Sequence, residues 1–322
     1  MRFGGQRQPG VTARLLTSGL LVGAVAGCGS DTDSADVTVV TSVYPLEWLA
    51  EEIVANTEAD ISVTNLTEPG LDPHDLELSP RQVGQIGDAD LVFYIEGMQP
   101  AVDDAVAQQT DASDGTGSTA LNVADIVELR TVDVANTGAE EGDEDPHMWL
   151  DPELFATTAE AFADQLAATV DSGAHPDAAD DLTGAAEEVS AELDDIDEEY
   201  QRGLADCELR TFVVSHAAFG YLADRYDLEQ ISISGIEPET EPSPARMREV
   251  TDLVNDSGVS TIFTEVLVSP QVAETIAAET GVSVEVLDAL EGLAEDSPGD
   301  DYPSIMRANL DALTGALDCS GS

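Results

Sequence analysis

The sequence predicts an α/β protein made of two parallel-sheet lobes that are joined by one long rigid helix. Strand-like runs rich in β-branched residues alternate with helical segments in both halves of the chain, and this alternation is typical of parallel sheets. Between the halves, residues 176–204 are acidic and alanine-rich, with apolar residues at helical spacing. At about 1.5 Å per residue, that helix would be more than roughly 40 Å long, so we expect it to act as a spine.

The first half contains several segments with clear strand or helix signals. Apolar, β-branched runs predict strands at residues 37–43, 61–66 and 91–95. Tyr44-Pro45 ends the first strand, and residues 46–56 then show helical spacing. Ser79-Pro80 places a capping residue before a proline, which is a common helix start. Residues 108–119 are polar and contain glycine, so we expect a loop or short insertion there.

The second half repeats the alternation. Strands are predicted at residues 211–215, 230–233, 260–264 and 283–287. Helices are predicted at residues 152–170 before the spine, and at 217–226, 245–255, 270–279 and about 302–317 after it. We therefore expect an N-terminal lobe at residues 37–175, a connecting helix at 176–206 and a C-terminal lobe at 207–322.

The start of the chain has the features of an export signal. Arg2, Arg7 and Arg14 precede an apolar stretch, 15–26, which is too short and too rich in glycine to span a bilayer. Small residues then stand directly before Cys28, as at a bacterial lipoprotein processing site. We expect residues 1–27 to be a signal peptide and 28–36 a linker lipidated at Cys28. The protein would then be extracytoplasmic and lipid-anchored to the cell membrane.

Charge and cysteine content narrow the classes of partner. A formal charge of −55 makes nucleic acid and anionic lipid headgroups poor partners. The charge by itself does not indicate a metal site, and it is equally consistent with life in high salt, where self-repulsion is screened. Of the three cysteines, lipidation of Cys28 would leave Cys207 and Cys319. An even remainder in an exported chain favours a disulfide over two free thiols.

Three of the four histidines occupy unusual settings. Two lie in Asp-Pro-His motifs, at His74 and His147, where proline stiffens the backbone next to the imidazole. The third, His216, follows a strand-like run. The fourth, His175, stands near the start of the long helix, is most simply solvated, and is excluded from the candidate site.

The ends of the predicted strands suggest where these histidines meet. His74, His216, Glu265 and Asp288 all follow strand-like runs, and open α/β sheets bind ligands outside the carboxyl ends of their strands. If the halves face each other, His74 and His147 come from one wall, and His216 and Asp288 from the other. Three imidazoles and a carboxylate suit a four-coordinate divalent transition metal, with Zn²⁺ favoured and Mn²⁺ favoured only by a more oxygen-rich set.

Longer motifs carry a family resemblance that covers essentially the whole mature chain. They are Asp72-Pro73-His74-Asp75-Leu76-Glu77-Leu78-Ser79-Pro80, Asp145-Pro146-His147-Met148-Trp149-Leu150-Asp151-Pro152, Ser215-His216-Ala217-Ala218-Phe219-Gly220-Tyr221-Leu222, and Gly235-Ile236 with residues 239–243. The chain resembles the metal-binding lipoproteins of bacterial zinc and manganese ABC importers (solute-binding protein family 9, TroA-like or ZnuA-like). The resemblance implies a single metal in the inter-lobe cleft, bound by His74, His147, His216 and Asp288, a membrane permease as partner, and a monomer.

The resemblance also bears on the choice of metal and on the alternatives. In this family a histidine at the position of His216 is typical of zinc members, and glutamate of manganese members. The loop at 136–145 lacks the histidines that many zinc members carry, and Asp288 lacks the proline that often follows it, which leaves Glu265 as a substitute ligand or supporting carboxylate. A surface adhesin, a manganese-binding relative on the same fold and a zinc hydrolase remain alternatives. Since the chain has no His-Glu-x-x-His or Gly-x-Ser-x-Gly motif, we expect a binding protein and not an enzyme.

Overall fold

The computed structural model describes residues 35–111, 118–137, 142, 144–170 and 173–320. The predicted signal peptide, Cys28 and the linker up to residue 34 lie outside these residues. Among the helices that are described, none combines the length and the apolar character needed to cross a bilayer.

The described part of the chain contains two parallel sheets. The first contains β1 (Val37–Thr41), β2 (Ile61–Asn65), β3 (Leu91–Tyr94) and β4 (Thr119–Asn122) in the order β2-β1-β3-β4. The second contains β5 (Thr211–Val214), β6 (Glu229–Ser232), β7 (Thr261–Thr264) and β8 (Ser283–Val286) in the equivalent order β6-β5-β7-β8. The predicted fold class is confirmed, and both sheets have a topological switch point beside their first strand.

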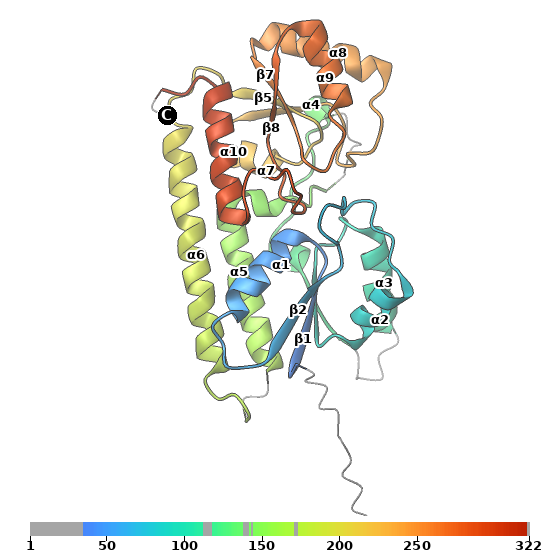
Figure 1. Ribbon diagram of the computed structural model, residues 1–322, viewed down its shortest axis with the longest axis vertical. Helices are drawn as coiled ribbons and strands as arrows, with labels where there is room; N and C mark the ends of the chain where they lie inside the picture. The colour runs from blue at the N-terminus through green and yellow to red at the C-terminus, as the bar shows by residue number, and fades with distance from the viewer. Residues whose placement is uncertain (1–34, 112–117, 138–141, 143, 171–172, 321–322) are drawn as a thin grey trace, which may run out of the picture. The chain divides into compact units, whose positions relative to one another are not determined.

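Helices flank both sheets (Figure 1). In the first half these are α1 (Tyr44–Val54), α2 (Pro80–Asp88), α3 (Pro100–Asp111), the 3-10 turn η1 (Val123–Asp125), α4 (Val134–Thr137), the 3-10 turn η2 (Met148–Leu150) and α5 (Pro152–Thr169). The second half adds α6 (Ala178–Gly203), α7 (Gly220–Arg225), α8 (Pro244–Ser257), α9 (Gln271–Thr280) and α10 (Tyr302–Ala316). As predicted, Ser79 caps α2, and it forms a reciprocal capping box with Gln82.

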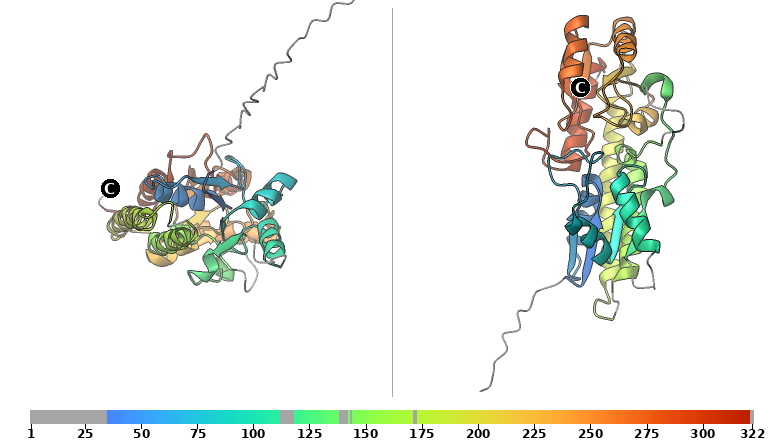
Figure 2. Two further views of the ribbon diagram at one scale, coloured as in Figure 1. Left: turned by 90° about the horizontal axis from the view of Figure 1, so that it is seen from below. Right: turned by 90° about the vertical axis from the view of Figure 1, so that its right-hand side faces the viewer.

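The long helix α6 connects the two halves. Its apolar stripe, which includes Leu182, Leu193 and Ile196, is buried. The helix lies alongside α5 (Figures 1 and 2) and also contacts α1 of the first half and α10 of the second. At its C-terminal end, the Tyr200 hydroxyl donates a 2.7 Å hydrogen bond to the Met306 carbonyl of α10. The helix is therefore fixed against elements on both sides.

One apolar core spans the two halves. It runs from β1 and α1 through α5 and α6 to β5 and α10. Near its centre Trp48 stacks on Tyr302 with ring centroids 4.8 Å apart, and Phe155 lies 5.0 Å from the same tyrosine ring. Beyond the end of α10, Cys319 forms a disulfide with Cys207. Shared packing of this kind limits how far the sheets can move apart.

Candidate metal centre

Four buried side chains converge between the two sheets. His74 follows β2, His147 precedes η2, His216 follows β5, and Glu291 lies in the loop after β8. In the part of the chain that the structure describes, these four form the one group of three or more histidine, cysteine, aspartate or glutamate residues suited to a metal ion. Their ligand atoms all lie within 4.8 Å of one another.

Glu291 occupies the centre of this group. Its Oε1 atom lies 2.8 Å from His147 Nε2 and 3.1 Å from the Nε2 atoms of both His74 and His216. The Nε2 atoms of His74 and His147 are 3.3 Å apart. The three rings therefore present the same nitrogen atom to a shared point.

A carboxylate stands behind each of two rings. Asp145 Oδ1 lies 2.8 Å from His147 Nδ1, and Glu265 Oε2 lies 2.6 Å from His216 Nδ1. The third ring is held less closely, because Glu237 Oε1 is 3.8 Å from His74 Nδ1 and its side chain is half exposed. A carboxylate on Nδ1 fixes the tautomer that leaves the Nε2 lone pair free to bind a metal.

The structure brings together His74, His147 and His216, as predicted, but it places Glu291 where the sequence analysis put Asp288. The Asp288 backbone is tied to Asn309 of α10, and its Oδ1 accepts a 2.8 Å hydrogen bond from the Leu290 backbone N–H. The chain then turns at Leu290, which has a positive φ of 61°, and points Glu291 toward the imidazoles. Glu265 lies behind His216 and outside the group of four.

The sequence signal that could have identified Glu291 was weak. It lies three residues after the expected ligand, between the apolar pair Ala289-Leu290 and Gly292. Only the direction of the turn at Leu290 distinguishes the two acids, and that direction depends on contacts with α10.

A family model described as the zinc-uptake complex component A, periplasmic (ZnuA), matches residues 39–316. The chain belongs to the ZnuA family. This is a family of uptake components and not of enzymes.

Among its relatives, the zinc-binding protein AdcA of Streptococcus pyogenes serotype M6 is 35% identical over 300 residues, covering 88% of this chain. The chain spans 57% of the length of that curated relative. The high-affinity zinc uptake system protein ZnuA of Bacillus subtilis is 33% identical over 317 residues, covering 91% of this chain and 93% of that protein.

A comparison with a solved structure gives a similar result. The laminin-binding protein Lmb of Streptococcus agalactiae, described as a bifunctional protein with adhesin and metal transporting activity, is 32% identical with a TM-score of 0.73. The match covers 87% of this chain and 99% of Lmb. The two-lobed α/β fold is therefore shared across the length of that structure.

In this ZnuA-family chain, the carboxylates around the imidazoles change the proton affinities of the centre. Burial lowers the proton affinity of His74, but the carboxylates of Glu291 and Glu237 outweigh it and raise its pKa to about 10. Burial is likewise outweighed at His216, where Glu265 and Glu291 raise the pKa well above its usual value. Burial would raise the pKa of Glu291, yet the charges of His216 and His74 hold it well below its usual range. The imidazoles of His74 and His216 and the carboxylate of Glu291 therefore favour each other's charged forms.

The His147 turn is attached to the second half of the molecule. The Trp149 indole N–H donates a 2.8 Å hydrogen bond to the Ala289 carbonyl, and the Tyr302 hydroxyl donates to the Trp149 carbonyl at 2.6 Å. His147 was predicted to lie on the wall of the first lobe. The contacts of Trp149 also bind its turn to the loop that carries Glu291 and to α10.

Proposed function

We propose that this chain is the extracytoplasmic solute-binding component of an ABC importer, which captures zinc and delivers it to a membrane permease. The family description and the names of the two curated relatives support zinc uptake. In this proposal His74, His147, His216 and Glu291 bind the ion, and zinc is the transported substrate rather than a catalytic cofactor.

The spacing of the four ligand atoms carries the proposal. Tetrahedral zinc holds nitrogen and oxygen ligands at about 2.0–2.2 Å, which places neighbouring ligand atoms roughly 3.3–3.6 Å apart. Four of the six separations here are 2.8, 3.1, 3.1 and 3.3 Å, and all the ligand atoms lie within 4.8 Å of one another. A cation at the centre would lengthen these contacts slightly and would supply positive charge beside the Glu291 carboxylate in place of protons on the imidazoles.

A competition measurement with two ring variants tests the ligand set. We expect His216→Ala to weaken zinc binding strongly in competition with a chromophoric chelator. His175→Ala is the matched control, because this fourth histidine contacts Asp36 at 3.0 Å and lies outside the group of four. Equal losses in the two variants would remove His216 from the site.

To test the preference for zinc over manganese, the ratio of the two affinities must be compared between the wild type and a variant. Divalent zinc binds most nitrogen and oxygen sites more tightly than manganese does, so a tighter zinc constant alone decides little. Replacing His216 by glutamate makes the ligand set richer in oxygen and should narrow the ratio of the zinc to the manganese affinity. An unchanged or wider ratio in His216→Glu would contradict a zinc preference set by this imidazole.

Four protein ligands also argue for binding rather than catalysis. Catalytic zinc keeps a coordination position for water, whereas a site closed by four side chains does not. We therefore infer that the chain is not an enzyme. The cobalt(II)-substituted protein should give a visible spectrum typical of tetrahedral coordination without an exchangeable water, and a bound exchangeable water would favour the hydrolase alternative.

Adhesion is a second candidate function, because Lmb combines metal transport with an adhesin activity. Binding of the purified protein to immobilised laminin, with and without zinc, tests it. Failure to bind laminin would remove this candidate and would leave the transport proposal untouched.

The setting of the protein in the cell completes the proposal. We infer that residues 1–27 are removed, that Cys28 carries the lipid anchor, and that a monomer delivers zinc to the permease. Cys28→Ser should release the protein from the membrane fraction without changing its zinc affinity. Deletion of the gene should slow growth in zinc-depleted medium, and normal growth there would count against the transport proposal.

A further inference from the structure

We propose that Arg130 is a positioning residue for the metal centre, because it holds His147 in place through Asp145 without contacting the site itself. The inference rests on the proposed zinc site and extends it to a residue that no motif of the chain singles out. Three observations carry it: a chain of contacts from Arg130 to His147, the attachment of Arg130 to α7, and the lack of space beside Gly220.

The chain of contacts passes through a fully buried carboxylate. Asp145 Oδ1 lies against the Nδ1 atom of His147 and also accepts a 3.1 Å hydrogen bond from the His147 backbone N–H. Asp145 Oδ2, the other oxygen, contacts Arg130 Nη1 at 3.2 Å. The backbones of the two residues are also joined, because the Asp145 N–H donates to the Arg130 carbonyl at 2.9 Å. Arg130 thus fixes the position of the group that orients the imidazole.

Burial makes the guanidinium necessary to this arrangement. The Asp145 side chain is fully buried, and a buried carboxylate without a counter-charge is strongly unfavourable. Arginine suits this position because its planar fork can serve two carboxylates at once. Its Nη2 atom lies 2.9 Å from the exposed Asp224 Oδ2, while Nη1 faces Asp145. Removing the fork would leave the Asp145 side chain free to rotate, and His147 would then lose the contact that orients its ring.

The anchor of Arg130 belongs to the second half of the molecule. Tyr221 of α7 accepts a 2.9 Å hydrogen bond from the Arg130 backbone N–H, and its hydroxyl donates to the Asp145 carbonyl at 2.9 Å. The guanidinium also lies over the Tyr221 ring, 5.7 Å from its centroid. Since α7 follows the turn that carries His216, the same short helix helps to position both His147 and His216.

Gly220 leaves the space that the guanidinium occupies. A Cβ atom built at Gly220 would lie 1.8 Å from Arg130 Nη1 and 2.7 Å from Asp145 Oδ2. Both atoms would have to move if residue 220 had a side chain. Gly220 begins α7, where alanine is the better helix former, so a loss of function in Gly220→Ala would come from displacement of the arginine and not from a weaker helix.

The test compares zinc affinities of the purified full-length protein in a chelator competition. Arg130→Ala should bind zinc roughly 10–100-fold more weakly, which is typical for loss of a residue that supports a metal ligand. Arg130→Lys keeps the charge but not the fork, and should lie between the wild type and Arg130→Ala. The matched control is Arg307→Ala, which removes an equal charge and an ion pair with Glu199 between α10 and α6, and should change the affinity by less than about twofold.

Two further measurements separate positioning from general stability. The visible spectrum of cobalt(II) at saturation reports ligand geometry, and it should change in Arg130→Ala but not in Arg307→Ala. Gly220→Ala should reproduce the affinity loss of Arg130→Ala, and the double variant should lose no more than either single variant, as expected for residues that act through one contact.

The outcomes are distinguishable. If the wild type binds no zinc, the proposed function fails. If the wild type binds zinc and folded Arg130→Ala binds it as tightly, with an unchanged cobalt spectrum, the positioning inference fails alone. Additive losses in the double variant would also overturn it. Should Arg130→Ala not fold, Arg130→Lys and Gly220→Ala still decide the question.

Discussion

Glu291 brings one carboxylate oxygen to within 3.1 Å of three imidazoles, so the Glu291→Gln variant is the most direct test of the centre at the scale of a residue. The amide keeps the shape of the side chain but removes the charge and one metal-binding oxygen. We expect zinc affinity to fall by more than the roughly 10–100-fold typical of a supporting residue. The measurement is chelator competition on the folded variant.

Asp288→Asn is the control, because Asp288 was the ligand expected from the sequence. Its carboxylate is already engaged by the Leu290 backbone N–H. A greater affinity loss in Asp288→Asn than in Glu291→Gln would favour the sequence-based assignment over the geometry of the structure.

Proton release is the second prediction at the residue scale. Neighbouring carboxylates raise the pKa of His74 to about 10 and that of His216 well above its usual value, so we expect these rings to hold protons in the metal-free protein at neutral pH. Zinc binds only the neutral imidazoles and must displace these protons. The apparent zinc affinity should therefore keep rising with pH between about 7 and 9, and not level off just above the ordinary histidine pKa of about 6.5.

Calorimetry at pH 7.5 in two buffers with different ionisation enthalpies measures this release. We expect roughly one to two protons to leave for each zinc ion bound. Identical heats in the two buffers would show that the rings are neutral before zinc arrives.

The sequence predicts the three histidines of the candidate site, but it does not predict Glu291, the carboxylate that the structure places beside them. His74 and His147 stand in stiff Asp-Pro-His motifs, and His216 directly follows a strand, so local patterns place all three. Glu291 is positioned by a turn whose shape depends on Asn309 of α10, and Asp145 is positioned by Arg130 and Tyr221. Such long-range contacts leave no periodic signal in the chain.

At the scale of the element, the disulfide offers a measurable contribution to stability. Cys207 and Cys319 are separated by 112 residues, and their bond joins the segment after α6 to the segment after α10. In the chain-entropy model, closing a loop of about 100 residues stabilises the fold by up to roughly 4–5 kcal/mol. The double variant Cys207→Ser with Cys319→Ser should therefore unfold at a lower denaturant concentration than the wild type.

Reductant separates this effect from the change of side chain. It should lower the unfolding midpoint of the wild type toward that of the double variant and leave the double variant unchanged. Equal midpoints for the oxidised wild type and the double variant would contradict a stabilising bond.

The strength of local signals explains which elements were predicted well. The stripe of α6 gave its position to within a few residues, because Leu182, Leu193 and Ile196 repeat at helical spacing over many turns. The edge strand β4, in contrast, was not predicted, and it begins at the last residue of the segment 108–119 that was expected to be a loop. Its first two residues are exposed, so the sequence has no apolar run that would indicate a strand there. The short helix α4 was also missed, because its position depends on packing against β6 of the other half.

At the scale of the whole molecule, the net charge of −55 means that acidic residues far outnumber the basic residues that could pair with them. Arg225 contacts Asp151, Glu153 and Asp197, and so ties α7 to the start of α5 and to α6. Arg307 ties α10 to Glu192 and Glu199 of α6. These basic side chains lie at junctions between elements, and the ion pairs that they form leave out many of the exposed acidic residues that the structure describes.

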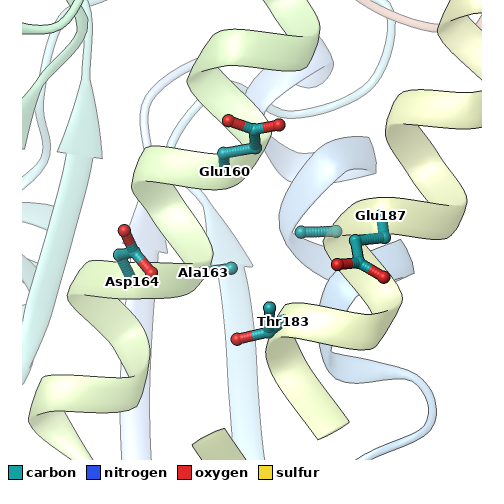
Figure 3. Close-up of a pocket in the computed structure, with 6 residues that line it drawn as sticks. Glu160, Ala163, Asp164, Thr183 and Glu187 are labelled. Carbon is teal, nitrogen blue, oxygen red and sulfur yellow. The ribbon is translucent and has the colours of Figure 1, made fainter. Parts of the chain in front are cut away.

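The groove between α5 and α6 contains such acidic residues. Glu160 and Asp164 of α5 and Glu187 of α6 line it together with Thr183, Ala163 and Ala186 (Figure 3). No basic side chain is among these lining residues. Glu160 and Asp164 are also four residues apart on one helix, where like charges destabilise it.

Salt should therefore stabilise the fold. The screening length falls from about 10 Å at 0.1 M salt to about 3 Å at 1 M, so repulsion among exposed carboxylates weakens over that range. We expect the melting temperature of the metal-free protein to rise steadily as sodium chloride increases from 0.1 to 2 M. Sodium chloride is chosen over sulfate because sulfate also strengthens apolar burial.

The triple variant Glu160→Gln, Asp164→Asn, Glu187→Gln shows whether local repulsion causes this dependence. Removing the three charges should raise the melting temperature at 0.1 M salt by roughly 2–4 °C, and it should flatten the salt dependence. The matched control is Glu153→Gln, Glu192→Gln, Glu199→Gln, which removes the same charge from residues that pair with Arg225 and Arg307. Because those carboxylates have basic partners, the control should gain nothing at low salt. An equal gain in both triple variants would attribute the effect to net charge, and a salt-independent wild type would exclude repulsion as a limit on the stability of this fold.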